Sequence, residues 1–222
     1  MMDCMQTASI LIVDDHPVFV QGFAQLIESR NRYHIAGTAI NSHDALRILE
    51  DRQPDLVIVD LNLGDEDGLA LIEEIRKQNK ETRILVFSMH EERYYSERVL
   101  QLGAHGYVMK IAPMEDVFLA IQTVLEGKTY LSEAEHARLL EYAVTESNLQ
   151  GKEARFASID ELSTRQLQVF TLLGKGAGTI EIAAQLQLSR KTVDKHKENI
   201  KARLHCSTSQ DLRQLAIEWV RH

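Results

Sequence analysis

Residues 55–68 read DLVIVDLNLGDEDG and carry the pattern that decides the fold. Residues 56–59 form a continuous apolar run, rich in β-branched side chains, that ends at Asp60. A run without polar alternation predicts a strand covered on both faces, as in a parallel sheet between helices. Asp60 then lies at the carboxyl end of that strand, which is the edge where open parallel sheets bind ligands.

Four further strands are expected in the first half of the chain. Residues 10–13 (ILIV) and 84–87 (ILVF) repeat the continuous apolar pattern, and residues 33–38 and 106–109 are weaker candidates. Apolar residues recur at helical spacing between and after these runs, in residues 19–27, 45–49, 69–75, 99–102 and 117–125. Strand and helix alternate five times, which predicts an α/β domain with a doubly wound, five-stranded parallel sheet ending near Gly127.

The rest of the chain has no strand pattern and is predicted to be helical. Residues 132–143 form one expected helix, and the polar residues 145–158 have no periodicity and are predicted to be a linker. Four short helices are expected over residues 164–175, 180–186, 190–204 and 209–221, with Ser163 and Gln166 as a capping box and Ser189 as an N-cap. The predicted division is residues 1–130, a helix and linker over 131–158, and a small all-α domain over 159–222.

Composition and charge narrow the class of protein. The net charge is −8, which argues against a nucleic-acid coat protein, but residues 158–222 carry ten Lys and Arg against seven acids. That stretch is therefore +3 and the remainder −11, so a nucleic-acid surface is expected at the back of the chain. Cys4 and Cys206 have no disulfide or metal-ligand spacing, and acidic residues interrupt the first 30 positions. We therefore expect a soluble, cytoplasmic protein without a signal peptide or membrane span.

Polar residues follow the predicted strands at the points where the strands end. Asp14 and Asp15 follow the first strand and Asp60 the third, and Ser88 and Lys110 stand at the ends of the fourth and fifth. Three converging carboxylates repel one another and suit a hard divalent cation such as Mg²⁺. A lysine and a hydroxyl nearby would bind the oxygens of a phosphoryl group carried by one carboxylate as an acyl phosphate. Any one of these residues alone is more simply a solvated side chain.

Residues 9–127 resemble the receiver domain of two-component signalling, which has a flavodoxin-like fold. The matching segments are ILIVDDHP (10–17), DLVIVDLNLGDEDG (55–68), VFSMH (86–90) and GYVMK (106–110). The resemblance implies that Asp60 is the phosphoacceptor and that Mg²⁺ is held by Asp14, Asp15, Asp60 and the Asn62 carbonyl. It also implies that Lys110 pairs with phosphoryl oxygens and that Ser88 and Tyr107 are the switch residues. Gly64 stands where the family usually has proline.

The predicted helix over residues 190–204 has two unlike faces. Val193, Ile200 and Leu204 can pack inward, with the stem of Lys197 at their edge, and the opposite face is polar. Such a helix can be an ordinary solvated surface helix, but the whole pattern over residues 161–222 resembles a LuxR-type helix-turn-helix. The resemblance implies a recognition helix, and the predicted DNA contacts are Arg190, Lys191, Thr192, Asp194, Lys195, His196, Glu198 and Lys201.

The two resemblances together imply a response regulator of the NarL/FixJ class, a transcription factor and not an enzyme. A sensor histidine kinase is expected to phosphorylate Asp60, and homodimers are expected to bind double-stranded DNA with two recognition helices about one helical turn apart. Two alternatives remain open. The tail could be a protein-interaction module, or the chain could bind DNA as a dimer without phosphorylation. Likewise, Leu212, Leu215, Ala216 and Trp219 could form a dimer seam or pack on their own domain.

Overall fold

The computed structural model describes residues 7–64, 66–145, 159 and 161–221. The chain divides into two compact units, Met1–Glu141 and Tyr142–His222, and each is described by itself. Cys4 and almost all of the predicted linker, residues 146–158, lie outside the described residues.

The first unit is built on a parallel sheet in the order β2-β1-β3-β6-β7. Its strands are β1 (Ala8–Val13), β2 (Tyr33–Ala39), β3 (Leu56–Val59), β6 (Arg83–Ser88) and β7 (Gly106–Met109). All four residues of β3 are buried, because helices cover both faces of the sheet. The doubly wound, five-stranded sheet predicted from the apolar runs is therefore confirmed.

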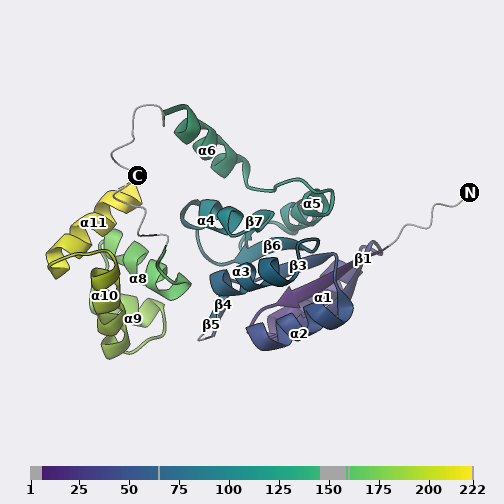
Figure 1. Cartoon of the computed structure of the whole chain (residues 1–222), viewed down its shortest axis with the longest axis horizontal. Coiled ribbons are helices and arrows are strands. Elements are labelled where there is room, and N and C mark those ends of the chain that lie inside the picture. The colour runs from purple at the N-terminus through teal and green to yellow at the C-terminus, as the bar shows by residue number, and fades with distance from the viewer. Residues whose placement is uncertain (1–6, 65, 146–158, 160, 222) are drawn as a thin grey trace, which may run out of the picture. The chain divides into compact units, whose positions relative to one another are not determined.

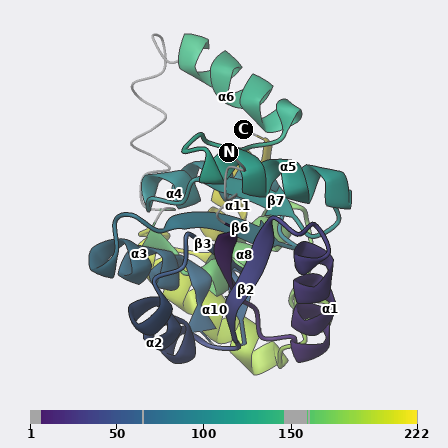
Figure 2. The same cartoon turned by 90° about the vertical axis from the view of Figure 1, so that its right-hand side faces the viewer.

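Helices lie on both sides of this sheet, as Figure 2 shows. On one side are α1 (Pro17–Glu28) and α5 (Met114–Leu125), and on the other are α2 (Ser42–Arg52) and α3 (Gly68–Gln78). The 3-10 turn η1 (Glu92–Tyr94) and α4 (Ser96–Gln101) connect β6 to β7. The core under α1 and α5 includes Phe23, Ile58, Phe87 and Ile121, all buried. These packed layers hold the strand ends, and the side chains that follow them, in fixed positions.

A two-stranded hairpin follows β3, formed by β4 (Asn62–Leu63) and β5 (Glu66–Asp67). Gly64 lies in its turn with φ +64°, in the left-handed region that suits glycine. Proline, with φ fixed near −65°, cannot adopt this conformation. Glycine in place of the proline usual in the receiver family therefore fits the backbone conformation of this turn.

The sheet does not end at β7, since the chain returns to it after α5. Tyr130 pairs in parallel with Gly106, the Tyr107 amide donates to the Tyr130 carbonyl at 3.0 Å, and the Tyr130 amide donates to the His105 carbonyl at 3.0 Å. Helix α6 (Glu133–Thr145) begins three residues later, close to the range predicted from sequence. The start of the segment between the two units is thus fixed to the edge strand.

In the second unit, the described residues 161–221 form α8 (Thr164–Gly174), α9 (Thr179–Gln185), α10 (Arg190–Arg203) and α11 (Ser209–Arg221), drawn in green to yellow in Figure 1. The Ser163–Gln166 capping box and the Ser189 cap form as predicted. Helix α9 begins one residue earlier than expected, since the Glu181 carboxylate accepts a hydrogen bond from the Gly178 amide. A Cβ at Gly174 would collide with the backbone of Ala216, so α8 and α11 pack closely.

The apolar face of α11 packs within its own unit. Leu212, Leu215 and Ala216 are buried, and the rings of Phe170 and Trp219 lie 5.5 Å apart. Of the two interpretations left open by the sequence, packing on the domain is therefore the one observed. Trp219, the fourth residue of this stripe, is half-buried.

Candidate functional site: the acidic cluster and the exposed face of α10

The residues predicted at the strand ends meet at one edge of the sheet. Lys110 Nζ donates to Asp14 Oδ2 at 2.5 Å and to Asp60 Oδ2 at 2.6 Å. The side chains of Asp14 and Asp60 are 3 % and 4 % exposed, so this is a buried arrangement and not a surface ion pair. Residues from the ends of β1, β3 and β7, far apart in the sequence, thus form one charged cluster.

Burial and charge oppose each other in this cluster. Burial raises the pKa of Asp60 above its ordinary value, although the Lys110 ammonium acts against the rise. Burial would lower the pKa of Lys110, but Asp60 and Asp14 together hold it above its ordinary value. Lys110 also lies over the ring of Phe19, with Nζ 4.8 Å from the ring centre. The lysine is therefore held charged and in place between the two carboxylates.

The carboxylates form a suitable set of donors for a hard divalent cation. One ligand atom from each of Asp14, Asp15, Asp60 and His16 can be chosen so that all lie within 4.8 Å of one another. Asp15 Oδ1 is buried without a hydrogen-bond partner, although it lies 2.8 Å from His16 Nδ1. Three carboxylates face one ammonium here, so a cation would offset the excess negative charge. Sequence reasoning did not single out His16.

Asn62 lies beside the predicted phosphoacceptor. The backbone amide of Asn62 donates to Asp60 Oδ1 at 3.2 Å. This hydrogen bond orients the carboxylate through the oxygen that Lys110 does not contact. The predicted role of the Asn62 carbonyl as a metal ligand stays a prediction.

The two predicted switch residues lie in the interior beside this cluster. Ser88 and Tyr107 are both 0 % exposed, and the Tyr107 hydroxyl donates to the His90 carbonyl at 3.0 Å. Burial raises the pKa of the Tyr107 phenol well above its ordinary value, so the group is a hydrogen-bond donor at neutral pH. The ring of His90 in turn stacks on Tyr95 at 5.1 Å. The loop after β6 is thereby connected to Tyr107.

Helix α6 is attached to the same region through buried carboxylates. Glu92 Oε1 accepts from the Ser132 amide at 3.0 Å, and the Ser96 hydroxyl donates to Glu135 Oε1 at 2.5 Å. Glu135 is 5 % exposed and also pairs with Arg138. Sequence reasoning missed this attachment, although Ser132 followed by Glu135 is the spacing of a capping box and marks the helix start.

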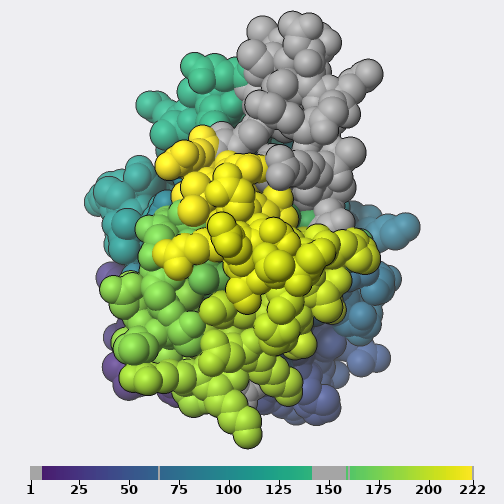
Figure 3. Space-filling model, turned by 90° about the vertical axis from the view of Figure 1, so that its left-hand side faces the viewer, coloured from purple at the N-terminus to yellow at the C-terminus, as the bar shows by residue number. Residues whose placement is uncertain are grey.

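The recognition helix predicted from sequence corresponds to α10. Val193 and Ile200 are buried, as expected, and Leu204 is half-buried. Among the predicted DNA contacts, five are exposed and three half-buried. The exposed residues are Arg190, Lys191, Asp194, Lys195 and Glu198, and the half-buried ones are Thr192, His196 and Lys201. Figure 3 shows one face of this unit, on which α10 and α11 lie side by side.

Several side chains of α10 are engaged within the unit. Lys201 Nζ lies 2.8 Å from Glu198 Oε2, and Lys197 Nζ lies 3.9 Å from Asp194 Oδ1. Lys197 also donates to Thr179 Oγ1 at 3.1 Å and so joins α9 to α10. The pKa of His196 is lowered by burial and by the positive charges of Arg165 and Lys195. The polar face thus presents mixed charge on a rigid helix.

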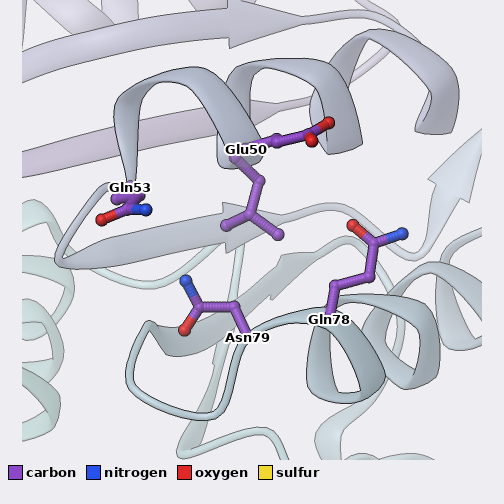
Figure 4. Close-up of a pocket in the computed structure, with 5 residues that line it drawn as sticks. Glu50, Gln53, Gln78 and Asn79 are labelled. Atoms are coloured by element: carbon purple, nitrogen blue, oxygen red, sulfur yellow. The ribbon is translucent and has the colours of Figure 1, made fainter.

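A separate pocket lies in the first unit, between the carboxyl ends of α2 and α3 (Figure 4). It has a volume of about 420 Å³ and is lined by Leu49, Glu50, Gln53, Gln78 and Asn79. Both helices end where the next strand begins, whereas Asp60 lies at the carboxyl end of β3. None of the residues predicted as site residues lines this pocket.

The chain combines a buried acidic cluster on a receiver-like sheet with a helical unit whose helices α8 to α11 are of helix-turn-helix type. Comparison with known families agrees with both parts. Residues 10–122 match the response regulator receiver domain, and residues 160–216 match the bacterial regulatory proteins of the luxR family.

Two of the similar proteins match almost the whole chain. The oxygen regulatory protein NreC of Staphylococcus aureus (strain JH9) is 34 % identical over 210 residues, covering 94 % of this chain and 96 % of the relative. RcsB from Salmonella enterica serovar Typhimurium, in a structure bound to promoter rprA in the presence of phosphomimetic BeF3-, is 25 % identical with a TM-score of 0.56 and covers 94 % of this chain and 98 % of that one.

A LuxR-family response regulator from Aurantimonas sp. SI85-9A1 is 32 % identical with a TM-score of 0.59 and covers 63 % of this chain and 99 % of that chain. The present chain belongs to the two-component response regulators of the NarL/FixJ class, and it is a response regulator transcription factor. Within the part of the chain that the structure describes, no helix has the length and apolar character needed to cross a membrane.

Proposed function

We propose that a partner sensor histidine kinase phosphorylates this regulator on Asp60, and that phosphorylation controls its binding to double-stranded DNA. The proposal rests on one observation: the Lys110 ammonium contacts both Asp14 and Asp60 in a buried cluster. Asp60, which follows the central strand β3, accepts from the Lys110 ammonium on Oδ2 and from the Asn62 backbone amide on Oδ1. Such an arrangement orients a nucleophile and supplies a cation for the oxygens of an incoming phosphoryl group.

The proposed transfer forms one bond and breaks one. A carboxylate oxygen of Asp60 attacks the phosphorus of a phosphohistidine, the P–N bond breaks, and the imidazole leaves and takes up a proton. Mg²⁺, held by Asp14, Asp15, Asp60 and the Asn62 carbonyl, would supply positive charge to the carboxylates and phosphoryl oxygens. Lys110 then exchanges its contact with Asp60 Oδ2 for one with a phosphoryl oxygen.

The proposed readout passes through Ser88 and Tyr107. A hydrogen bond from the Ser88 hydroxyl to the phosphoryl group would shift the end of β6, and with it the His90 carbonyl that accepts from Tyr107. The Tyr107 backbone amide donates a hydrogen bond to the Tyr130 carbonyl, and α6 begins three residues after Tyr130. The switch residue and the segment leading to the second unit are therefore connected by a direct hydrogen bond.

The second unit is proposed to bind DNA through α10, as a homodimer and in the cytoplasm. The proposed contacts to bases and phosphates are Arg190, Lys191, Thr192, Asp194, Lys195, His196, Glu198 and Lys201. Exposure of five of these side chains on one rigid helix supports the assignment. The RcsB structure bound to promoter DNA supports the same mode of action for a chain of this family.

The phosphoacceptor is tested with a small-molecule donor. Incubated with Mg²⁺ and acetyl phosphate, the wild-type protein is expected to gain one phosphoryl group by intact mass, and Asp60→Asn none. Asp51→Asn, which removes an exposed carboxylate on α2, is the matched control and should label as wild type does. Labelling of Asp60→Asn to the wild-type extent would place the phosphoryl group elsewhere. DNA binding that is unchanged by labelling would favour a regulator that acts without phosphorylation.

A further inference from the structure

His16 lies beside the acidic cluster and has had no role so far. It follows Asp15 directly and occupies the N-cap position of α1, where Ser, Thr, Asp or Asn usually satisfies the free amides of the helix. The His16 side chain makes no capping hydrogen bond. Its Nδ1 atom instead lies close to the carboxylates, although the side chain is 65 % exposed.

We propose that His16 is a nitrogen ligand of the divalent cation, and that it shifts the preference of the site from Mg²⁺ toward transition metals such as Mn²⁺ and Co²⁺. This inference rests on the proposed function, because it assumes a cation at the acidic cluster. It concerns which ion is bound and by which atoms, not whether Asp60 is phosphorylated.

The distances fit neighbouring positions of one coordination shell. Neighbouring ligand atoms of an octahedral ion with metal–ligand bonds of about 2.1 Å lie about 3 Å apart. His16 Nδ1 lies 2.8 Å from Asp15 Oδ1 and 3.1 Å from Asp14 Oδ1. A ligand atom of Asp60 falls within the same 4.8 Å set. These distances are compatible with one small ion that contacts the imidazole and the carboxylates, beside the hydrogen bonds that Asp14 and Asp60 already accept.

The state of Asp15 adds a second observation. Its Oδ1 atom is buried and accepts no hydrogen bond, in spite of the short distance to His16 Nδ1. A buried carboxylate oxygen without a donor is costly unless a cation or another partner satisfies it. A cation between Asp15 and His16 would use both the free oxygen and the nitrogen lone pair.

The chemistry of the donors then sets the ion preference. Carboxylates alone suit Mg²⁺, whereas an imidazole favours first-row transition metals, with affinity rising from Mn²⁺ through Co²⁺. The competing explanation is a hydrogen bond from His16 Nδ1–H to Asp14 Oδ1, which the 3.1 Å distance also allows. In that case Nδ1 carries the proton and cannot bind a metal.

Electron paramagnetic resonance with Mn²⁺ separates the two explanations. The full-length protein, labelled with ¹⁵N only in histidine, is titrated with Mn²⁺, and electron spin echo modulation reports nitrogen bound to the ion. We expect a ¹⁵N coupling in the wild-type protein that is absent in His16→Gln. His43→Gln is the matched control, because His43 also neighbours a carboxylate, at 3.8 Å from Asp44, but is 88 % exposed and lies outside the cluster.

Competition with Mg²⁺ gives a second readout from the same samples. Displacing Mn²⁺ from the wild-type protein should need about tenfold more Mg²⁺ than displacing it from His16→Gln, while His43→Gln behaves as wild type. Bound Mn²⁺ without ¹⁵N coupling, or equal displacement from both proteins, would overturn the role of His16 and leave the metal site intact. Absence of Mn²⁺ binding from the wild-type protein would overturn the metal site itself, and the inference with it.

Discussion

Lys110 and Lys201 both pair with carboxylates, yet the two pairs differ in burial and in what they can do. Lys110 is 9 % exposed and contacts Asp14 and Asp60, which are 3 % and 4 % exposed. Lys201 is 23 % exposed and contacts Glu198, which is 65 % exposed. Lys110 is the cation that balances the buried carboxylates of Asp14 and Asp60 in the folded protein. The second pair is more exposed, and its lysine is the one proposed to exchange its carboxylate for a DNA phosphate.

This difference separates the two functional regions physically. In the acidic cluster, the fold forces the charges together, and each group depends on its neighbours. On α10 the ion pairs are more exposed, so solvent screens them more, and the proposed roles of these side chains require DNA. Substitutions in the first region should therefore change stability and function together, and those in the second region function alone.

The largest effect is expected for Lys110→Ala. Removing the ammonium leaves Asp14 and Asp60 buried without their cation, which should lower the free energy of unfolding by about 3 kcal/mol. Added Mg²⁺ should recover part of this loss, since the ion binds the folded state. Urea denaturation measures both effects. Lys77→Ala, which breaks an exposed pair with Glu73, is the control and should leave the midpoint unchanged. A loss for Lys110→Ala as small as that of the control would contradict the comparison.

Ser88→Ala tests whether the interior switch can be uncoupled from the chemistry. The hydroxyl is fully buried and is proposed to sense the phosphoryl group, so the variant should still be labelled on Asp60 by acetyl phosphate. It should lose most of the increase in dimerisation that labelling produces, as measured by sedimentation velocity at matched labelling. Full dimerisation of the labelled variant would remove Ser88 from the readout.

Asp194→Ala probes the exposed region. A carboxylate facing DNA is repelled by phosphates but can accept from a cytosine amino group, so the variant should bind random DNA more tightly. It should also lose roughly 1–3 kcal/mol of discrimination at one base pair. Selection from a randomised DNA pool measures this change. The 3.9 Å approach of Lys197 offers the opposing account, a pairing role on the helix surface. The same consensus from both proteins would support that account.

The smallest stability change is expected for Lys201→Ala. Glu198 is exposed and Lys201 half-buried, so loss of this partly screened pair should cost less than about 1 kcal/mol in unfolding free energy. Binding to all DNA sequences should nevertheless weaken alike, and the slope of log affinity against log salt should become shallower by about one. A sequence-dependent loss, or an unchanged slope, would show that Lys201 does not contact a phosphate.

Most of the fold could be predicted because each element leaves a periodic pattern in the sequence. Continuous apolar runs such as residues 56–59 can be covered on both faces only in a parallel sheet, and the ends of such strands meet at one edge. That rule is sufficient to place Asp14, Asp60 and Lys110 together from the amino-acid sequence alone. The position of α10 likewise follows from its buried stripe and from the Ser189 cap.

Features that depend on a single residue were not predicted. Tyr130 pairs with Gly106 in a single isolated β-bridge. One bridge produces no periodic pattern of apolar residues, so the sequence does not predict it. The approach of His16 to the carboxylates depends on a side-chain rotamer at a helix start, which the sequence does not encode locally. The burial of the α11 face was left undecided, because an apolar stripe is the same whether it packs on its own domain or on a partner.

The central claim is that phosphorylation of Asp60 controls DNA binding by the second unit. Fluorescence anisotropy tests it most directly, with full-length protein, Mg²⁺ and a labelled DNA duplex obtained by selection from a randomised pool. Acetyl phosphate is predicted to tighten binding of the wild-type protein and to leave Asp60→Asn unchanged, with both proteins equal in its absence. Equal affinity of the wild-type protein with and without acetyl phosphate, at complete labelling of Asp60, would contradict the account.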